Sequence, residues 1–204
     1  MTQDELFQQL KHPNPNLRDR AMIELADSRD ETTIPRLISL MGEEDVVYRR
    51  SAVKALGVIG AEAVPPLVKD LLDSENVTVR GSCAKALAQI ALNYPEEPFS
   101  AEGVQGLKTA LNDTNPVVYI ASVMALGEIG SPVLDILIEA LQTTDNVALA
   151  VSLVNAIASI GDNRGAELLK VLIDDESADP YVRETATSAL SRLQMVNQYR
   201  RKET

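Results

Sequence analysis

Histidine and cysteine, the side chains best suited to acid–base and nucleophilic chemistry, occur once each in this chain, as His12 and Cys83. A catalytic triad needs a histidine with partners at fixed distances, and a histidine-rich metal site needs a second histidine. His12 lies in a Lys-His-Pro-Asn-Pro segment, which is typical of an exposed turn. We therefore expect no catalytic role for His12 and no metal site, and we assign no catalytic residue.

Cys83 offers a thiol that could serve as a nucleophile or as a transient thioether carrier. The alternative is that it packs in the core as a small apolar residue. A thiol buried among aliphatic side chains has a raised pKa and little reactivity. A chain with a single cysteine forms no internal disulfide, which fits a reducing compartment.

A set of arginines recurs in similar surroundings and offers a second kind of chemistry, the binding of anions. Its members are Arg18, Arg49, Arg80 and Arg183. They could bind an anionic ligand, or each could pair with a carboxylate or carbonyl of the next repeat and hold the stack together. Carboxylates available for such pairs are Asp19, Asp45, Glu75 and Glu184. We favour the structural role.

All of these residues belong to a sequence that repeats about every 31 residues. One phrase reads ALGVIG at 55–60, ALAQIA at 86–91, ALGEIG at 125–130 and AIASIG at 156–161. Aligning the phrases upstream places the arginines in one column with Tyr119 and Ala150, at steps of 31, 31, 39, 31 and 33 residues. Such a period is typical of helical repeat proteins. The same alignment groups Cys83 with Ala21, Ala52 and Ala186, which favours the core position.

Each repeat predicts two helices, and the first carries small and aliphatic residues at helical spacing. Examples are Val47, Ala52, Ala55, Leu56 and Ile59. Residues whose side chains cap helix N-termini precede it: Asp45, Ser74 or Asn76, Asn115, Asp145 or Asn146, and Asp179. Prolines suited to a first turn are Pro15, Pro116 and Pro180. Glycines that accept positive φ at the helix end are Gly60, Gly130 and Gly161.

The second helix of each repeat is shorter and aliphatic, as in Val64-Pro-Pro-Leu-Val-Lys-Asp-Leu-Leu. Each pair buries its apolar face only by stacking on its neighbours. The sequence therefore predicts an all-α protein, an α-α superhelix of the HEAT-repeat solenoid class with about five to six helical pairs. We expect one domain over 1–204, with an insert loop at 93–100 and a polar C-terminal tail from about 196.

Three aromatic side chains are candidates for a surface that binds a partner. Tyr94 and Phe99 lie in the insert, whose two prolines and polar residues predict a loop. They could anchor a partner, or they could pack back onto the solenoid and close the loop; the sequence leaves both possibilities open. Tyr119 stands in the arginine column, and we expect it to be partly exposed.

The composition excludes some classes of partner. The net charge is −11, so the chain repels phosphate backbones and anionic membrane surfaces, and we expect no nucleic-acid binding. The N-terminus, MTQDELFQQL, lacks a signal peptide's apolar core, and no apolar run approaches the length of a membrane span. We expect a cytoplasmic protein with no membrane insertion.

Three longer segments carry a family resemblance: KHPNPNLRDRAMIELA, GEEDVVYRRSAVKALGVIG and LNDTNPVVYIASVMALGEIG. They resemble the HEAT-like repeat phycobilin lyase family of the E/F type, and within it the Z-type branch of phycoerythrin-lyase partners. The resemblance covers essentially the whole chain. The Cys/His motif of the isomerising lyases is missing here, since Cys83 and His12 lie far apart in sequence, so bilin isomerisation is not expected.

The resemblance implies a cyanobacterial accessory subunit or chaperone-like partner of a phycobilin lyase. Such a protein assists the attachment of phycoerythrobilin to a cysteine of a phycoerythrin subunit, a thioether-forming reaction that a two-protein complex carries out. The implied partners are a larger HEAT-repeat lyase subunit, a phycobiliprotein and a linear tetrapyrrole as substrate ligand, with no intrinsic cofactor. Basic residues on the second helices, Arg36, Lys69 and Lys108, would then pair with bilin propionates.

Two further functions remain open from the sequence. One is a non-catalytic HEAT-repeat scaffold or adaptor that acts on phycobilisome proteins during assembly or degradation. The other is a phycobilin lyase that is competent alone. Attachment of a bilin needs mainly orientation and a thiolate on the acceptor protein, so none of the three functions requires a nucleophile on this chain.

Overall fold

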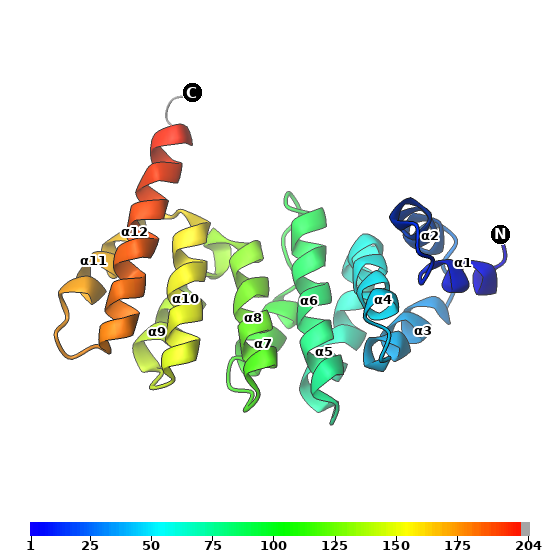
Figure 1. Ribbon diagram of the computed structural model, residues 1–204, viewed down its shortest axis with the longest axis horizontal. Helices are drawn as coiled ribbons and strands as arrows, with labels where there is room; N and C mark the ends of the chain where they lie inside the picture. The colour runs from blue at the N-terminus through cyan, green and yellow to red at the C-terminus, as the bar shows by residue number, and fades with distance from the viewer. Residues whose placement is uncertain (201–204) are drawn as a thin grey trace. The chain divides into compact units, whose positions relative to one another are not determined.

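The computed structural model describes the backbone of residues 1–200 and the side chains of residues 1–195 (Figure 1). Within this range the regular elements are α-helices and short 3₁₀ helices, which confirms the all-α prediction. They form two compact units, Met1–Ala125 and the part that begins at Leu126. Each unit is described by itself, and the expectation of one domain over 1–204 stays a prediction.

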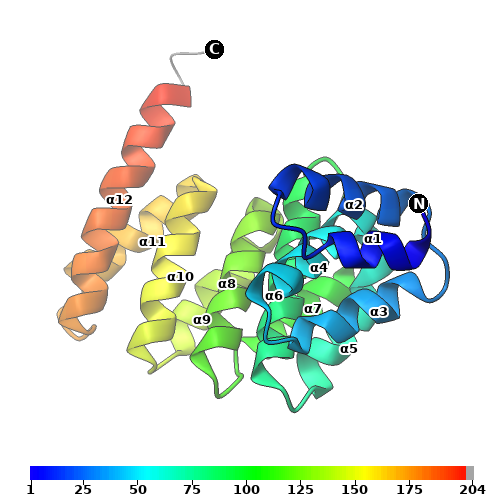
Figure 2. The ribbon, with the colours of Figure 1, turned by 45° about the vertical axis from the view of Figure 1, so that its right-hand side comes forward.

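The first unit stacks helices in the two alternating types that the repeat predicts. Its elements are α1 (Gln3–Gln9), α2 (Pro15–Asp27), α3 (Thr33–Ser39), η1 (Leu40–Gly42), α4 (Val46–Ile59), η2 (Gly60–Ala63), α5 (Val64–Asp73), α6 (Val77–Asn93), α7 (Ala101–Ala110) and most of α8 (Pro116–Ile129). The first-type helices α2, α4 and α6 contact one another in chain order, and the second-type helices α5 and α7 do the same. Figure 2 shows α1 beside α2 and α3.

The second unit continues the pattern from the end of α8. Its elements are η3 (Ser131–Val133), α9 (Leu134–Thr143), α10 (Val147–Ile160), α11 (Asn163–Asp174) and α12 (Pro180–Arg200). Helix α10 contacts α9, α11 and α12, and the core between them contains Val154, Leu169 and Ala186. The polar tail expected from about 196 begins as a continuation of α12, and residues 201–204 lie outside the described residues.

The helix starts confirm the predicted caps and decide between the alternatives. Asp45 Oδ1 accepts from the backbone N–H groups of Val47 and Tyr48, at 2.8 and 3.1 Å. Where two cap residues were possible, Asn76 caps α6 and Asn146 caps α10. Each satisfies N–H groups that have no partner inside the first turn.

The helix ends confirm the predicted glycines. Gly60, Gly130 and Gly161 have φ values of 83°, 84° and 77°. These are the described residues with positive φ; Gly161 is left-handed helical, whereas Gly60 and Gly130 have ψ values of −139° and −145°. Such conformations cost a residue with a Cβ about 1–3 kcal/mol. Glycine at these positions lets the chain leave a first-type helix and enter the second one within a few residues.

The predicted core column is buried, whereas one apolar residue outside that column is not. Ala21, Ala52, Cys83 and Ala186 are fully buried. Val47, which the helical pattern placed in the core, is instead exposed. The reason is rotation: Val47 precedes Ala52 by five residues, which puts it about 140° around α4 from the buried face.

One stretch, Val46–Asp73, is long and apolar enough to meet a length-and-hydropathy criterion for a membrane span. It is not one straight helix, because α4 ends at Ile59 and α5 begins at Val64. About 61% of its most apolar window is buried inside the protein. Core helices of globular proteins pass the same criterion, so this is weak evidence for a span.

The arginine column is structural, as we expected, but its partners differ from the expected carboxylates. Arg18 donates to the carbonyl of His12, Arg49 to that of Glu43 and Arg183 to that of Ile173. None of these bonds reaches Asp19, Asp45 or Glu184. A helical side chain points back toward its own N-terminus, so each arginine reaches the turn that precedes its helix rather than the next repeat.

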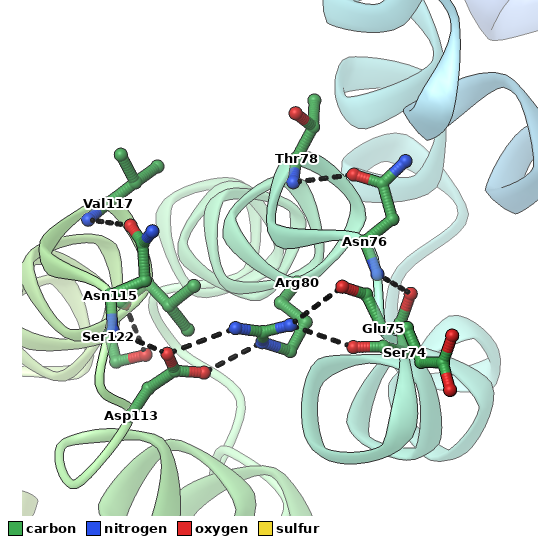
Figure 3. Close-up of polar contacts among 10 residues, drawn as sticks. Ser74, Glu75, Asn76, Thr78, Arg80, Asp113, Asn115, Val117 and Ser122 are labelled. Carbon is green, nitrogen blue, oxygen red and sulfur yellow. Dashed lines mark hydrogen bonds and ion pairs between the residues drawn. The ribbon is translucent and has the colours of Figure 1, made fainter.

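Arg80 alone of this column also reaches the next repeat (Figure 3). Its Nε and Nη2 donate to the two oxygens of Asp113 at 2.7 and 3.1 Å, and its Nη1 donates to the carbonyl of Ser74 at 2.9 Å. Both side chains of the pair are about 15% exposed or less. Asp113 also accepts from the N–H of Asn115, just before α8. One guanidinium therefore joins the turns that precede α6 and α8.

We expect Arg80→Ala to lower the free energy of unfolding by about 2–3 kcal/mol, because Asp113 and the carbonyls of Ser74 and Glu75 lose this donor. Arg49→Ala, which removes a single described carbonyl contact, should cost about 1 kcal/mol. Chemical denaturation of the two variants and the unmodified chain measures both values. Equal losses would contradict the special role of the Arg80–Asp113 pair.

The hydrogen bond from Arg80 lowers the pKa of Asp113 from its ordinary value of 3.8. Such a depressed pKa contributes stability that is present at neutral pH and is lost as the pH falls through the lowered value. The difference in stability between Arg80→Ala and the unmodified chain should therefore shrink as the pH falls from about 7 to about 3.

Candidate binding surface

Cys83 is a core residue, as we expected. It is fully buried on α6, and its Sγ lies 3.7 Å from Sδ of Met41 in η1. Burial away from water raises its pKa to about 12, so the thiolate that would react is scarce at neutral pH.

Among the described residues, no group of three or more histidine, cysteine or carboxylate side chains lies close enough together to hold a metal ion.

His12 stabilises the turn between α1 and α2. Its Nδ1 accepts from the N–H of Asn14 at 3.0 Å, and its carbonyl accepts from Arg18 at 2.7 Å. Asn14 is the N-cap of α2. The half-buried imidazole therefore helps to start a helix.

The aromatic residues of the insert pack back onto the first unit, which decides the question that the sequence left open. The Tyr94 hydroxyl donates to the carbonyl of Val58, and a Cβ on Gly60 would lie 2.9 Å from the Tyr94 ring. Phe99 covers Gly103, where a Cβ would lie 2.6 Å from its ring. Both rings are half-buried and close the loop between α6 and α7, so neither projects as an anchor.

Tyr119 is also structural, and the expectation that it is partly exposed was wrong. It is 5% exposed on α8. The column it occupies is enclosed by the preceding turn, as the low exposure of Arg80 in the same column also indicates.

The three basic residues expected to bind bilin propionates do not form one ladder. Relative to the buried leucines Leu37, Leu67 and Leu107, Arg36 stands one residue before, Lys69 two residues after and Lys108 one residue after. They therefore project at three different angles from their helices. Their role in binding an anionic ligand stays a prediction.

Arg36 is already engaged within the first unit. Its Nη2 pairs with Oδ1 of Asp4 at 2.8 Å, and its guanidinium lies 3.9 Å from the ring centre of Phe7. Both partners are on α1, so Arg36 holds α1 against α3. Lys69 is exposed on α5, and Lys108 is half-buried on α7.

The sequence analysis missed a group of exposed aliphatic residues at the turns that lead into first-type helices. They are Val46, Val47, Leu72 and Val117. The signal was available, because the alignment puts Val47 and Val117 in the same column, directly after the cap and first helical residue. Residues at this position lie at the edge of the helix layer: Val117 contacts Gly81 of α6, yet Val47 and Val117 remain 42% and 49% exposed.

Comparison with known families identifies the type of helical repeat. A sequence model of HEAT repeats matches residues 4–88 and 104–191, well over half of the chain. The chain belongs to the HEAT-repeat family. The match is interrupted between these two ranges, where this HEAT-repeat protein carries the loop that Tyr94 and Phe99 close.

Two curated relatives of this HEAT-repeat protein match over nearly their whole length. The "uncharacterized phycocyanin operon protein Z" of Pseudanabaena tenuis (strain PCC 7409) is 63% identical over 98% of the chain and 100% of that protein. The "bilin biosynthesis protein CpeZ" of Synechococcus sp. (strain WH8020) is 34% identical over 85% of the chain and 96% of that protein. The resemblance that the sequence segments indicated is therefore confirmed.

A solved structure supports the architecture. A designed armadillo repeat protein, solved in complex with the peptide (KR)4, is similar over 95% of this chain and 100% of its own, with a TM-score of 0.52. The sequence identity is 22%. At that level the similarity shows the helical-repeat fold alone.

We expect Gly60→Ala to destabilise the HEAT-repeat protein more than Gly130→Ala does. Both glycines have nearly the same positive φ and a ψ near −140°, so both substitutions bear a similar backbone strain of about 1–3 kcal/mol. Only at Gly60 does the new methyl group collide with the Tyr94 ring, whereas nothing lies within 4 Å at Gly130. The free energies of unfolding from denaturant titrations measure the difference.

The double variant Gly60→Ala/Tyr94→Ala isolates the collision. If Tyr94 packs over Gly60, the two changes are non-additive, because removal of the ring relieves the collision. Additive losses would show that the ring does not rest on Gly60 in solution.

We expect Cys83 to resist alkylation by iodoacetamide at pH 8 in the folded protein. Both its burial and its raised pKa suppress the thiolate. In denaturant the same thiol should react at the rate of a free cysteine. Intact-mass spectrometry follows both reactions, and rapid labelling of the folded chain would contradict the core assignment.

Proposed function

We propose that this protein is an accessory subunit or chaperone-like partner of a phycobilin lyase, and that it assists the attachment of a linear tetrapyrrole to a phycobiliprotein cysteine. The observation that carries the proposal is the extent of its match to the bilin biosynthesis protein CpeZ, which spans 96% of that protein. The 63% identity to a phycocyanin operon protein also supports a role in phycobiliprotein production.

The chemistry of the described residues supports an assisting role rather than a covalent one. Thioether formation joins a thiolate of the acceptor protein to a vinylic carbon of the tetrapyrrole. Cys83, the only cysteine of the chain, is buried and protonated, so it supports no covalent carrier step. What a helical-repeat surface contributes is the orientation of two other molecules, which alone can accelerate a reaction by several orders of magnitude.

Within this proposal the larger HEAT-repeat lyase subunit is the second protein of the complex, and phycoerythrobilin is the substrate ligand. Lys69 is the best placed of the three basic candidates to meet a propionate, because it is exposed on α5 whereas Arg36 is paired with Asp4. The acceptor expected from the sequence is a phycoerythrin subunit. The name of the 63% identical relative favours a phycocyanin subunit as a second candidate.

Coexpression in a bacterial host that makes phycoerythrobilin tests the proposal. The host carries one apo-phycobiliprotein subunit, from phycoerythrin or from phycocyanin, and the larger lyase subunit, with or without this chain. Covalent bilin is measured on denaturing gels by zinc-enhanced fluorescence. We expect the amount of covalently attached bilin to rise when this chain is present. We expect this rise with only one of the two acceptor subunits.

The variant Cys83→Ala serves as the control. Alanine occupies the same column in other repeats, as Ala21 and Ala52 show, so the variant is expected to fold and to keep full activity. Loss of attachment with folding intact would instead make Cys83 part of the chemistry. Attachment that is unchanged by omission of this chain would favour a plain scaffold, and attachment without the larger subunit would favour a lyase competent alone.

A further inference from the structure

The turns that lead into first-type helices form one edge of the first unit. We call residues 42–47, 72–78 and 112–117 the turn edge. Three observations place these turns side by side: Gly42 lies against Asn76, Arg80 joins Ser74 to Asp113, and Gly81 lies against Val117. Figure 3 shows the part of this edge around Arg80, with Thr78 and Val117 at the starts of α6 and α8.

Exposed aliphatic side chains gather on the turn edge. Val46, Val47, Leu72 and Val117 are each between 42% and 49% exposed. Single exposed aliphatic residues are normal on a protein surface, but several on one edge indicate a contact surface. Val117 packs over Gly81 with part of its side chain and still leaves about half of it exposed.

Carboxylates surround these aliphatic residues and point outward. Glu43, Glu44, Asp73 and Glu75 are all exposed on the turn edge. Two of the arginines nearby are turned inward: Arg49 binds the carbonyl of Glu43, and Arg80 binds Asp113 and the carbonyl of Ser74. These two cations serve the backbone of the turns, and Arg50 remains exposed in the first turns of α4. The turn edge therefore presents more exposed carboxylates than exposed cations, with exposed aliphatic side chains among them.

The second unit, taken by itself, repeats the combination. Val147 and Tyr181 are exposed at the starts of α10 and α12. Exposed carboxylates stand in the turns before them, at Asp145, Asp174 and Glu176. A pattern that recurs in a separate unit is a property of the repeat design rather than an accident of one turn.

We infer that the turn edge is a docking surface for a partner protein segment that presents lysine or arginine side chains next to aliphatic or aromatic ones. Charge complementarity selects this occupant. A second copy of the chain would bring a net charge of −11 against the same negative edge, and nucleic acids and anionic lipids are repelled in the same way. The inference does not depend on whether the protein assists bilin attachment.

Binding of a designed peptide to the full chain tests the inference. The probe is a short fluorescein-labelled peptide in which lysine and leucine alternate, and binding is followed by fluorescence anisotropy at low salt. Matched peptides replace leucine with serine or lysine with glutamate. We expect the lysine–leucine peptide to bind tightest and to weaken as salt screens the charges.

Two sets of variants locate the site. Glu43→Gln/Glu44→Gln/Glu75→Gln removes edge charge, and it should weaken binding about tenfold and reduce the dependence on salt. Val47→Ser/Val117→Ser removes apolar area, and it should weaken binding by a similar factor without changing that dependence. Circular dichroism and thermal unfolding establish that both variants keep the fold.

A matched control lies at the opposite end of α6. Leu92 is 59% exposed there, and Glu96 and Glu97 are exposed in the loop that follows. Leu92→Ser/Glu96→Gln/Glu97→Gln changes the same kinds of group about 20 Å away along the helix. We expect it to leave the affinity unchanged.

Three results would overturn the inference. The first is equal weakening by the control and edge variants, which would mean that only the overall charge matters. The second is equal affinity for the lysine–leucine and lysine–serine peptides. The third is a concentration-dependent dimer in size-exclusion chromatography that the Val47→Ser/Val117→Ser variant abolishes, which would make the occupant of the edge a second copy of the chain.

Discussion

The close approach of neighbouring helices is the constraint on which the rest of this fold depends. In the first unit, α5 and α7 meet where Gly106 has no side chain; a Cβ there would lie 2.7 Å from a methyl group of Val68. Ala52 and Cys83 are small, fully buried residues that allow α4 and α6 to approach each other in the same way. With aromatic residues at 3% of the chain, the core consists of leucine and other aliphatic side chains, and the alanines and glycines between them let the helices approach closely. Each helical pair therefore depends on its neighbours for stability.

The turns between the closely packed helices also determine which groups the arginine side chains bind. The turns between repeats carry carbonyl groups that helices leave unsatisfied, and Arg18, Arg49 and Arg80 supply the missing donors from within. Arginine suits this position because its guanidinium reaches back past the helix start and bridges several oxygens at once. These three arginines therefore bind the backbone of the turns and leave little positive charge at their positions on the surface. Together with the excess of acidic over basic residues, this leaves the turns rich in exposed carboxylates.

The sequence predicted what depends on local chemistry and failed where the answer depends on distance between elements. The cap Asp45 and the glycine ends follow from short-range hydrogen bonding and backbone sterics, so the repeat register was enough to find them. For α6 the register narrowed the cap to Ser74 or Asn76, and the structure shows Asn76. The burial of Tyr119 and the partner of Arg80 depend on how far a turn stands from the next helix, which a column in an alignment does not contain. The sequence could not predict that Tyr94 packs onto the first unit, because this packing depends on the space that Gly60 leaves for the ring.

Burial of the only cysteine has a consequence for the proposed role. A linear tetrapyrrole with a reactive vinylic carbon adds to any accessible thiolate, so a helper with a free surface thiol would capture the ligand and compete with the acceptor protein. In this chain the core column that needs a small residue holds Cys83, and burial raises its pKa to about 12. The same packing constraint that allows the helices to approach each other therefore leaves the surface without a competing nucleophile of this kind. Orientation by surface contacts then remains as the means by which such a chain can promote the transfer.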